Sequence, residues 1–168
     1  MDRTVRDILE TVVAALVIAV LVRGFIIEPY VVNGPSMEPT LWTGERLFIS
    51  KLSYRFGEPK RGDIVMFRYP LNPEKDYVKR VVGIAGDTVE MRMGRVYING
   101  QQVSEPFVQF PGLYNMGPTV VPEGTVFVMG DNRANSEDSR EFGPVKLSLV
   151  RGKAVFRVWP LKTAGFLK

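Results

Sequence analysis

Histidine and cysteine are both absent from this chain of 168 residues. The two absences exclude the Ser-His-Asp triad, the cysteine proteases, disulfide bonds and metal sites built from imidazole or thiolate ligands. We expect neither a metal site nor a cofactor. A serine nucleophile in such a chain needs another proton acceptor, and lysine is the side chain best suited to that role.

A concentration of charge of either sign is also absent. Lysine and arginine together number 22, aspartate and glutamate number 18, and the two kinds interleave along the chain. A net charge of +4 spread in this way does not favour a nucleic-acid partner, although it would suit an anionic membrane surface. With 45% apolar residues and no internal repeat, the length predicts one folded domain with its own core.

Long apolar runs are scarce, and the exception lies near the N-terminus. Residues 8–27 have about the length that crosses a bilayer, with an uninterrupted apolar core over residues 12–22. The alternatives are a buried core helix and a cleaved signal peptide, but Arg23-Gly24-Phe25 follows the core where a cleavage site needs small residues. We expect an uncleaved signal anchor that spans the membrane once.

Basic residues around this segment predict its orientation. Arg3 and Arg6 precede it, whereas Arg23 alone follows closely, which places the N-terminus in the cytoplasm. The predicted organisation is a short cytoplasmic tail over residues 1–7, a transmembrane anchor over residues 8–27 and an extracytoplasmic all-β domain over residues 28–168.

Beyond Pro29 the pattern changes to short runs of β-branched and aromatic residues broken by Gly, Pro and Asp, which predicts an all-β domain. Asn99-Gly100 is a type I′ hairpin signal, so residues 101–103 should return antiparallel to the strand before it. Residues 104–122 hold four prolines and two glycines and are expected to form an irregular excursion. The expected strands cover residues 46–52, 63–69, 77–85, 88–91, 95–98, 125–129 and 153–159.

Ser36 and Lys79 are the first candidates for chemistry. Ser36 follows the apolar segment closely, in the run Ser36-Met37-Glu38-Pro39-Thr40. Lys79 lies in a predicted strand whose alternation puts it on one face with Tyr77 and Val81. If that face is the core side, desolvation lowers the pKa of Lys79 toward neutrality and makes it a usable general base. The alternative is an ordinary exposed lysine on a half-solvated strand.

A third candidate is the polar loop over residues 130–140, directly after the predicted strand over residues 125–129. Its Asp, Asn and Ser content is typical of a solvated turn, because these side chains bond to nearby backbone. The mixture of Asp138 and Arg140 with Ser136 also allows an ion pair and a hydroxyl that orient a neighbouring amine. Composition alone leaves both interpretations open.

Four segments, in order after the anchor, resemble the bacterial type I signal peptidases, the membrane-anchored Ser/Lys proteases that remove signal peptides from exported proteins. The resemblance covers nearly the whole chain. It implies an antiparallel β-sheet domain with one N-terminal transmembrane helix in the bacterial cell membrane, and two partners, the signal peptides of exported preproteins and the lipid bilayer. The segments are residues 36–41 (SMEPTL), 61–67 (RGDIVMF), 77–83 (YVKRVVG) and 130–133 (GDNR) followed by Ser136, Asp138, Ser139 and Arg140.

The same resemblance assigns roles to individual residues. It implies that Ser36 is the nucleophile, that Lys79 is the general base and that the hydroxyl of Ser136 helps to orient Lys79. It also implies that Asp138 and Arg140 form a supporting salt bridge.

One departure from the family concerns the oxyanion hole. Some members carry a serine two residues before the nucleophile, where its hydroxyl completes the hole, but this chain has Gly34 there. Pro35 has no N–H, so the expected donors are the backbone amides of Ser36 and Gly34.

Two other functions stay open. A self-cleaving Ser/Lys protease of the repressor type would use similar chemistry on its own chain, but such proteins carry a DNA-binding module or a cleavable arm instead of a spanning helix. A membrane-tethered, non-enzymatic β module for binding or assembly would explain the architecture, but it gives no reason for Lys79 or for the loop over residues 130–140. Labelling by a serine-directed acylating inhibitor separates the enzyme from the tether.

We predict that Ser36→Ala and Lys79→Arg each give a folded protein that no longer cleaves a model preprotein. Alanine removes the nucleophile, and arginine keeps the positive charge but does not act as a base. The measurement is cleavage of the preprotein on a denaturing gel, with circular dichroism to verify folding. Cleavage retained by either variant would contradict the assignment.

Overall fold

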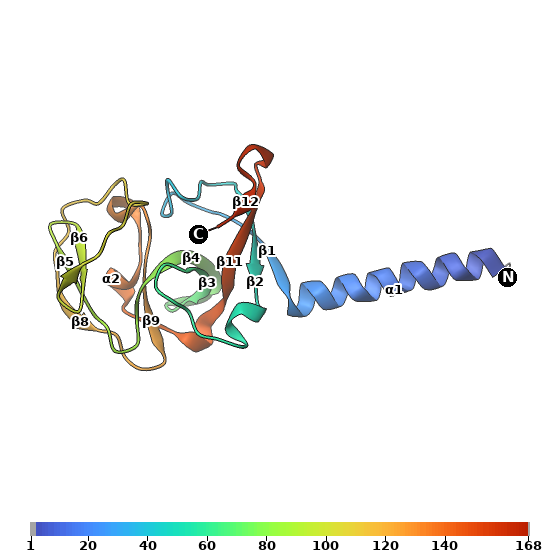
Figure 1. Ribbon diagram of the computed structural model, residues 1–168, viewed down its shortest axis with the longest axis horizontal. Helices are drawn as coiled ribbons and strands as arrows, with labels where there is room; N and C mark the ends of the chain where they lie inside the picture. The colour runs from blue at the N-terminus through green and yellow to red at the C-terminus, as the bar shows by residue number, and fades with distance from the viewer. Residues whose placement is uncertain (1–2, 168) are drawn as a thin grey trace.

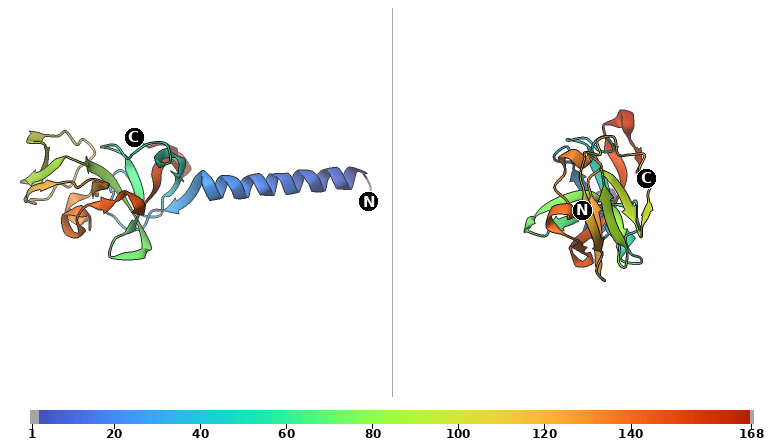
Figure 2. Two further views of the ribbon diagram at one scale, coloured as in Figure 1. Left: turned by 90° about the horizontal axis from the view of Figure 1, so that it is seen from below. Right: turned by 90° about the vertical axis from the view of Figure 1, so that its left-hand side faces the viewer.

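The computed structural model describes residues 3–167, without the side chains of residues 3, 21–23 and 25. A long helix extends from a body in which the described strands form two antiparallel sheets (Figures 1 and 2). The expected mainly β fold is confirmed in this part of the chain. Met1 and Asp2 of the predicted tail, and Lys168 at the end of the predicted domain, lie outside the described residues.

The helices and strands are numbered in chain order. The helices are α1 (Arg3–Phe25) and α2 (Ser139–Phe142), with short 3₁₀ helices η1 (Leu52–Tyr54), η2 (Arg133–Asn135), η3 (Leu147–Leu149) and η4 (Leu161–Thr163). The strands are β1 (Ile27–Val31), β2 (Arg46–Ser50), β3 (Ile64–Tyr69), β4 (Asn72–Ile84), β5 (Thr88–Arg92), β6 (Arg95–Ile98), β7 (Gln101–Gln102), β8 (Met116–Val120), β9 (Thr125–Met129), β10 (Val145–Lys146), β11 (Val150–Trp159) and β12 (Gly165–Phe166).

The larger sheet has the order β1-β2-β11-β3-β4-β9-β10, with β12 paired to β11, and the smaller has the order β7-β6-β5-β8. Strand β4 belongs to the larger sheet and leads through a short turn into β5 of the smaller one (Figure 1). Residues 78–83 of β4 are all buried, so both faces of this strand are covered where the two sheets adjoin.

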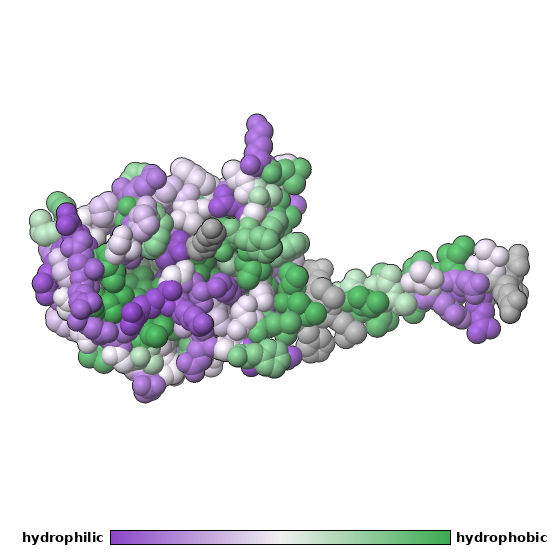
Figure 3. Space-filling view, in the orientation of Figure 1, coloured by the Kyte–Doolittle hydropathy of each residue, from purple (hydrophilic) through white to green (hydrophobic). Residues whose placement is uncertain are grey.

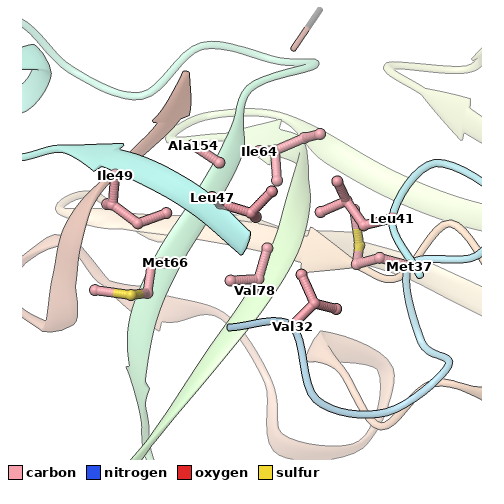
Figure 4. Close-up of a cluster of buried hydrophobic side chains, with 9 residues drawn as sticks. All are labelled: Val32, Met37, Leu41, Leu47, Ile49, Ile64, Met66, Val78 and Ala154. Carbon is pink, nitrogen blue, oxygen red and sulfur yellow. The ribbon is translucent and has the colours of Figure 1, made fainter. Parts of the chain in front are cut away.

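A cluster of nine buried side chains holds the loop after β1 in place (Figure 4). Met37 and Leu41 come from this loop, are 1% and 0% exposed, and join side chains of β2, β3 and β4. Burial of a Leu or Met side chain stabilises a fold by about 1.5–3 kcal/mol, so the core fixes the loop that carries Ser36. The members are Val32, Met37, Leu41, Leu47, Ile49, Ile64, Met66, Val78 and Ala154.

Each strand expected from the sequence has a counterpart in the structure, within a few residues at its ends. The hairpin at Asn99-Gly100 is confirmed: the φ angles of the two residues are 53° and 80°, and Ile98 pairs with Gln101. Positive φ at both turn residues is the geometry that a type I′ turn requires.

The expectation of an irregular segment over residues 104–122 is wrong at its C-terminal end, where β8 pairs with β5. Gly117 and Pro118 interrupt the sequence pattern of this strand, but β8 lies at the edge of its sheet, where a proline is tolerated. The sequence also does not reveal β1, which lies at the end of the predicted anchor, or β10 and β12, which have two residues each.

Helix α1 ends at Phe25 and β1 begins at Ile27, so the predicted boundary between residues 27 and 28 falls one residue inside β1. Residues 4–20 of α1 are exposed along their whole length. Among the helical residues whose structure and side chains are described, no helix combines the length and hydropathy needed to cross a membrane. The anchor expected over residues 8–27 stays a prediction.

Candidate active site

A cleft of about 670 Å³ opens between the loop after β1 and the first half of β4. The hydroxyl of Tyr30 in β1 donates to the backbone carbonyl of Asp76 in β4 over 3.1 Å and bridges the two walls. The residues that line the cleft are Tyr30–Met37, Lys75–Lys79, Asn135 and Glu137. Ser36 and Lys79, which are 43 positions apart in the sequence, therefore face the same space.

The hydroxyl of Ser36 and the amine of Lys79 are in direct contact, with 2.6 Å between Ser36 Oγ and Lys79 Nζ. Lys79 lies opposite Val65 of β3, and only 4% of it is exposed. The alternative of an ordinary exposed lysine is therefore wrong. The idea of one solvated face on this strand is also wrong, because the neighbouring Arg80 is buried as well.

Burial of Lys79 disfavours its charged form and lowers its pKa from 10.5 to about 8. The negative charges of Asp138, Glu137 and Asp131 oppose this shift, whereas the positive charge of Arg140 adds to it. At pH 8 about half of the amine is therefore neutral and able to accept a proton, whereas a lysine in water is almost entirely charged at this pH.

The loop over residues 130–140 is an ordered network around Asp138, which is completely buried. The carboxylate of Asp138 accepts from Ser136 Oγ at 2.8 Å, from the amide of Gly130 at 3.0 Å and from Arg140 Nε at 2.8 Å. A second bond from the Arg140 guanidinium, at 2.9 Å, makes the ion pair bidentate. The interpretation of this loop as a merely solvated turn is therefore wrong.

Ser136 is brought into this network, and its hydroxyl donates to Asp138. In the part of the chain that the structure describes, no hydrogen bond joins Ser136 to Lys79. Asp138 also caps α2, since it accepts from the amide of Arg140 at 3.2 Å.

The polar loop also holds the backbone around Ser36, a link that the sequence does not reveal. The amide of Asn132 donates to the carbonyl of Ser36 at 3.0 Å, and its side-chain amide donates to the carbonyl of Pro35 at 3.2 Å. Asp131 accepts from the hydroxyl of Thr40 at 2.5 Å, four residues beyond Ser36. The only sequence signal for these contacts is the run GDNR, which does not say what each side chain binds.

Arg80 and Asp131 form a second buried ion pair, with distances of 2.9 and 2.7 Å. Their side chains are 4% and 0% exposed, so each charge is stabilised by the other, with further bonds from Thr40 to Asp131 and from Arg80 to the carbonyl of Gly62. This pair connects β4, next to Lys79, with the loop that holds Ser36. The sequence does not reveal this ion pair, because strand alternation places Arg80 on the face opposite Lys79 but does not identify its partner.

The expected oxyanion donors lie at the edge of the cleft beside Ser36. Gly34 has a φ of 88°, which a glycine adopts without strain, and Pro35 separates it from Ser36. Within residues 3–167 the amides of Gly34 and Ser36 donate to no protein acceptor. The two N–H groups are therefore compatible with the expected role.

Comparison with known proteins gives consistent matches over most of this chain. A family model described as signal peptidase, peptidase S26, matches residues 5–159. Signal peptidase I of Bacillus licheniformis is 45% identical over 166 residues, which cover 90% of this chain and 87% of that protein. Signal peptidase I of Bacillus caldolyticus is 42% identical over 168 residues, which cover 92% of this chain and 91% of that protein.

The fold is similar to that of a solved structure as well. A crystal structure of a signal peptidase I from Enterococcus faecalis V583 matches with a TM-score of 0.51 and 37% sequence identity. The match covers 58% of this chain and 97% of that chain.

We predict that Gly130→Ala disturbs the site, because a Cβ at this position would collide with the carbonyl of Ser36 and the hydroxyl of Ser136. The free energy of unfolding should fall by about 1–3 kcal/mol, as for other overpacked positions. Acylation of Ser36 by a serine-directed reagent should slow in parallel. Urea denaturation and the rate of labelling measure the two effects.

Gly117→Ala is the matched control, since a Cβ there would meet no atom within 4 Å. This variant should keep its free energy of unfolding within about 0.5 kcal/mol and label at the normal rate. Equal effects of the two substitutions would show that glycine at position 130 has no special role.

We predict that Lys79→Met stabilises the protein at neutral pH, because the native fold buries a positive charge there. Lowering a pKa from 10.5 to about 8 corresponds to a gain of up to about 3 kcal/mol when the charge is removed, at about 1.4 kcal/mol per pKa unit. The unfolded chain binds more protons than the folded chain between these two pKa values. The advantage of the variant should therefore be largest below pH 8 and shrink as the pH rises to 10.5.

Urea denaturation at several pH values measures this difference. Lys162→Met, at an exposed position, is the control and should leave the free energy of unfolding unchanged at every pH. If Lys79→Met is less stable than the native chain at pH 7, the buried lysine does not lower the free energy of unfolding, and the prediction is wrong.

Proposed function

This chain belongs to the signal peptidase family, peptidase S26, and from that premise we propose that it removes N-terminal signal peptides from exported preproteins as a serine endopeptidase with Ser36 and Lys79 as its catalytic pair. The observation that carries this proposal is the 2.6 Å contact between the Ser36 hydroxyl and the buried amine of Lys79 in an open cleft. The direct test is cleavage of a preprotein, with the cut position identified by mass spectrometry.

In the first half of the proposed reaction, neutral Lys79 takes the proton of Ser36 as Ser36 Oγ attacks the peptide carbonyl carbon. The amides of Ser36 and Gly34 donate to the oxyanion that forms. The tetrahedral intermediate then collapses and expels the amine of the mature protein, which takes its proton from the Lys79 ammonium. The signal peptide is left as an ester on Ser36.

In the second half, a water oxygen attacks the ester carbonyl carbon while Lys79 accepts a proton from that water molecule. The collapse of this intermediate releases the signal peptide with a free carboxylate and returns the proton to Ser36 Oγ. The roles we assign to Ser136, Asp138 and Arg140 are supporting ones. Ser136 helps to orient Lys79 indirectly, because its hydroxyl binds Asp138, whose negative charge acts on Lys79. The Asp138–Arg140 pair keeps the loop in place.

The substrate binds, in this proposal, as an added strand between the two walls of the cleft. Family substrates carry small residues one and three positions before the cut, and Val32, Met37 and Val78 provide apolar wall for them. Strand β1 ends the larger sheet, so its outer edge has backbone groups available for pairing. A non-enzymatic tether would give no reason to bury a lysine against a serine in such a cleft.

We also propose that residues 8–27 attach the chain to the bacterial cell membrane, with the N-terminus in the cytoplasm and the β body outside. The apolar run, the exposure of residues 4–20 and the projection of α1 from the body support this (Figure 1). Figure 3 shows apolar residues on the side of the body nearest α1, over β2, β11 and β12. The exposed apolar side chains on these strands are Phe48, Trp159 and Phe166.

We predict an acidic limb in the pH profile of kcat/KM that reports Lys79. Since the neutral amine is the active form and its pKa is about 8, kcat/KM should rise through pH 8 and level off above it. Below this point the rate should fall by about tenfold per pH unit. The measurement uses a fluorogenic signal-peptide substrate from pH 5 to pH 10 at constant ionic strength, and a profile flat through pH 8 would exclude Lys79 as the base.

We predict that deletion of residues 1–23 releases the protein from membranes without unfolding its body. The deletion stops there because the backbone of Ile26 accepts from the amide of Lys51 at 2.9 Å, and β1 begins at Ile27. Cell fractionation detects the change, and the circular dichroism spectrum of the β body is the control. A full-length chain found in the soluble fraction would contradict the proposed attachment.

A further inference from the structure

We propose that Glu137 is a positioning residue for the Ser36–Lys79 pair: two tyrosine hydroxyls hold its carboxylate, which fixes the loop over residues 130–140 against β3 and β4 and places a permanent negative charge beside Lys79. This inference rests on the proposed function of that pair. It concerns a residue to which the family resemblance assigns no role.

The position of Glu137 in the chain places it next to two residues of the network around Lys79. It lies between Ser136 and Asp138, so a displacement of Glu137 moves both members of the network that borders Lys79. Glu137 also lines the cleft itself.

The two hydroxyl donors come from neighbouring strands of the larger sheet. Tyr69 of β3 donates to Glu137 Oε1, and Tyr77 of β4 donates to Glu137 Oε2 at 2.8 Å. The two tyrosine rings are stacked, with centroids 4.5 Å apart and an interplanar angle of 9°. Hydroxyls bind both oxygens of the carboxylate, and the rings that carry these hydroxyls are stacked, so the carboxylate has little freedom to move.

Aromatic packing makes this support rigid. Phe142 ends α2, which begins at Ser139 within the loop. Its ring contacts Tyr69 edge-on at 5.4 Å between ring centroids and lies 6.2 Å from Phe67. Phe67 in turn meets Tyr77 edge-on at 6.3 Å. The loop is thus attached to β3 and β4 in its middle, through Glu137, and at its end, through Phe142.

The charge of Glu137 differs from the other charges that act on Lys79, which come from Asp138, Arg140 and Asp131. Asp138 shares a bidentate ion pair with Arg140, and Asp131 shares one with Arg80. Glu137 is held by uncharged hydroxyls, and these bonds, first from Tyr69 and then from Tyr77, lower its pKa. The positive charges of Lys79 and Lys75 lower its pKa further, and Lys75 lines the same cleft. The negative charge of Glu137 is therefore present at working pH, and no arginine shares it in a bidentate ion pair of the kind that Asp138 and Asp131 form.

A permanent negative charge helps Lys79 at the step where the amine becomes an ammonium. Tyr77 connects the two groups directly, since its hydroxyl binds Glu137 and its ring centre is 5.2 Å from Lys79 Nζ. The charge of Glu137 raises the proton affinity of the buried amine and stabilises the ammonium that forms when Ser36 is deprotonated. The acidic partner of the histidine in a Ser-His-Asp triad acts on its base in the same sense.

The test compares the pH profile of kcat/KM for Glu137→Gln with that of the native chain. Glutamine keeps the size and one acceptor oxygen but removes the charge, so the proton affinity of Lys79 should fall. The acidic limb should move to lower pH by about half a unit, as expected for the loss of a unit charge several ångströms away. Glu137 is exposed, so water screens its field almost as strongly as in bulk solvent. The ratio of kcat/KM in the variant to kcat/KM in the native chain should therefore be higher at pH values well below the limb than on the plateau.

Glu123→Gln, which makes the same change at an exposed position in the turn before β9, is the control and should leave the limb in place. A Glu137→Gln limb at the native pH overturns the electrostatic half of the proposal. The underlying catalytic pair is tested separately, because cleavage by Ser36→Ala or Lys79→Arg would contradict the pair whatever the Glu137 result.

Tyr69→Phe/Tyr77→Phe is the complementary variant, since it keeps the rings and the charge and removes only the two hydroxyl donors. Loss of alignment should lower kcat on the alkaline plateau by about tenfold or more, with circular dichroism unchanged. A native plateau in this variant overturns the positioning half. If Glu137→Gln does not fold, the single variant Tyr77→Phe takes its place, with kcat on the alkaline plateau as its readout. A native plateau in that variant would overturn the proposal.

Discussion

The contact between a buried amine and a serine hydroxyl is the constraint on which the rest of the structure depends. An ammonium group removed from water is unstable unless its surroundings compensate for the lost solvation. Here the compensation is partial, because the carboxylates near Lys79 are committed to other partners, and the amine stays neutral more easily than a lysine in water. A fold selected only for stability would replace such a group with an apolar side chain.

The surrounding structure keeps this unfavourable group in one position. Lys79 pairs with Val65 of β3, and the pairing of β4 with β9 begins at the next residue, Arg80, so the backbone around Lys79 is fixed. Ser36 lies on a loop, and loops are mobile unless they are attached. Its attachment comes from apolar side chains below it and from Asn132, whose backbone and side-chain amides hold the carbonyls of Ser36 and Pro35. Ser36 is therefore positioned by contacts of its loop, whereas Lys79 is positioned by its strand.

The sequence predicts the parts of this site that depend on composition and on short runs. The absence of histidine favours a lysine as the base, and strand alternation puts Lys79 on one face with Tyr77 and Val81. Whether that face is the core side is settled only by the structure, where Lys79 is buried. The interactions that depend on packing between distant segments are not predictable in this way. The partner of Arg80 is Asp131, 51 positions away, and the partners of Glu137 are 68 and 60 positions away. Strand β8 escapes prediction for a related reason, since its edge position, which no local pattern encodes, makes Pro118 acceptable.

The junction between α1 and β1 consists of one residue, Ile26. Its carbonyl accepts from the amide of Lys51, and the carbonyl of Gly24 accepts from Lys51 Nζ at 3.4 Å. A flexible linker would let the body rotate freely about the end of the helix. A junction of one hydrogen-bonded residue restricts this rotation. The direction of the helix is therefore tied to β1, which carries Tyr30 in the wall of the cleft.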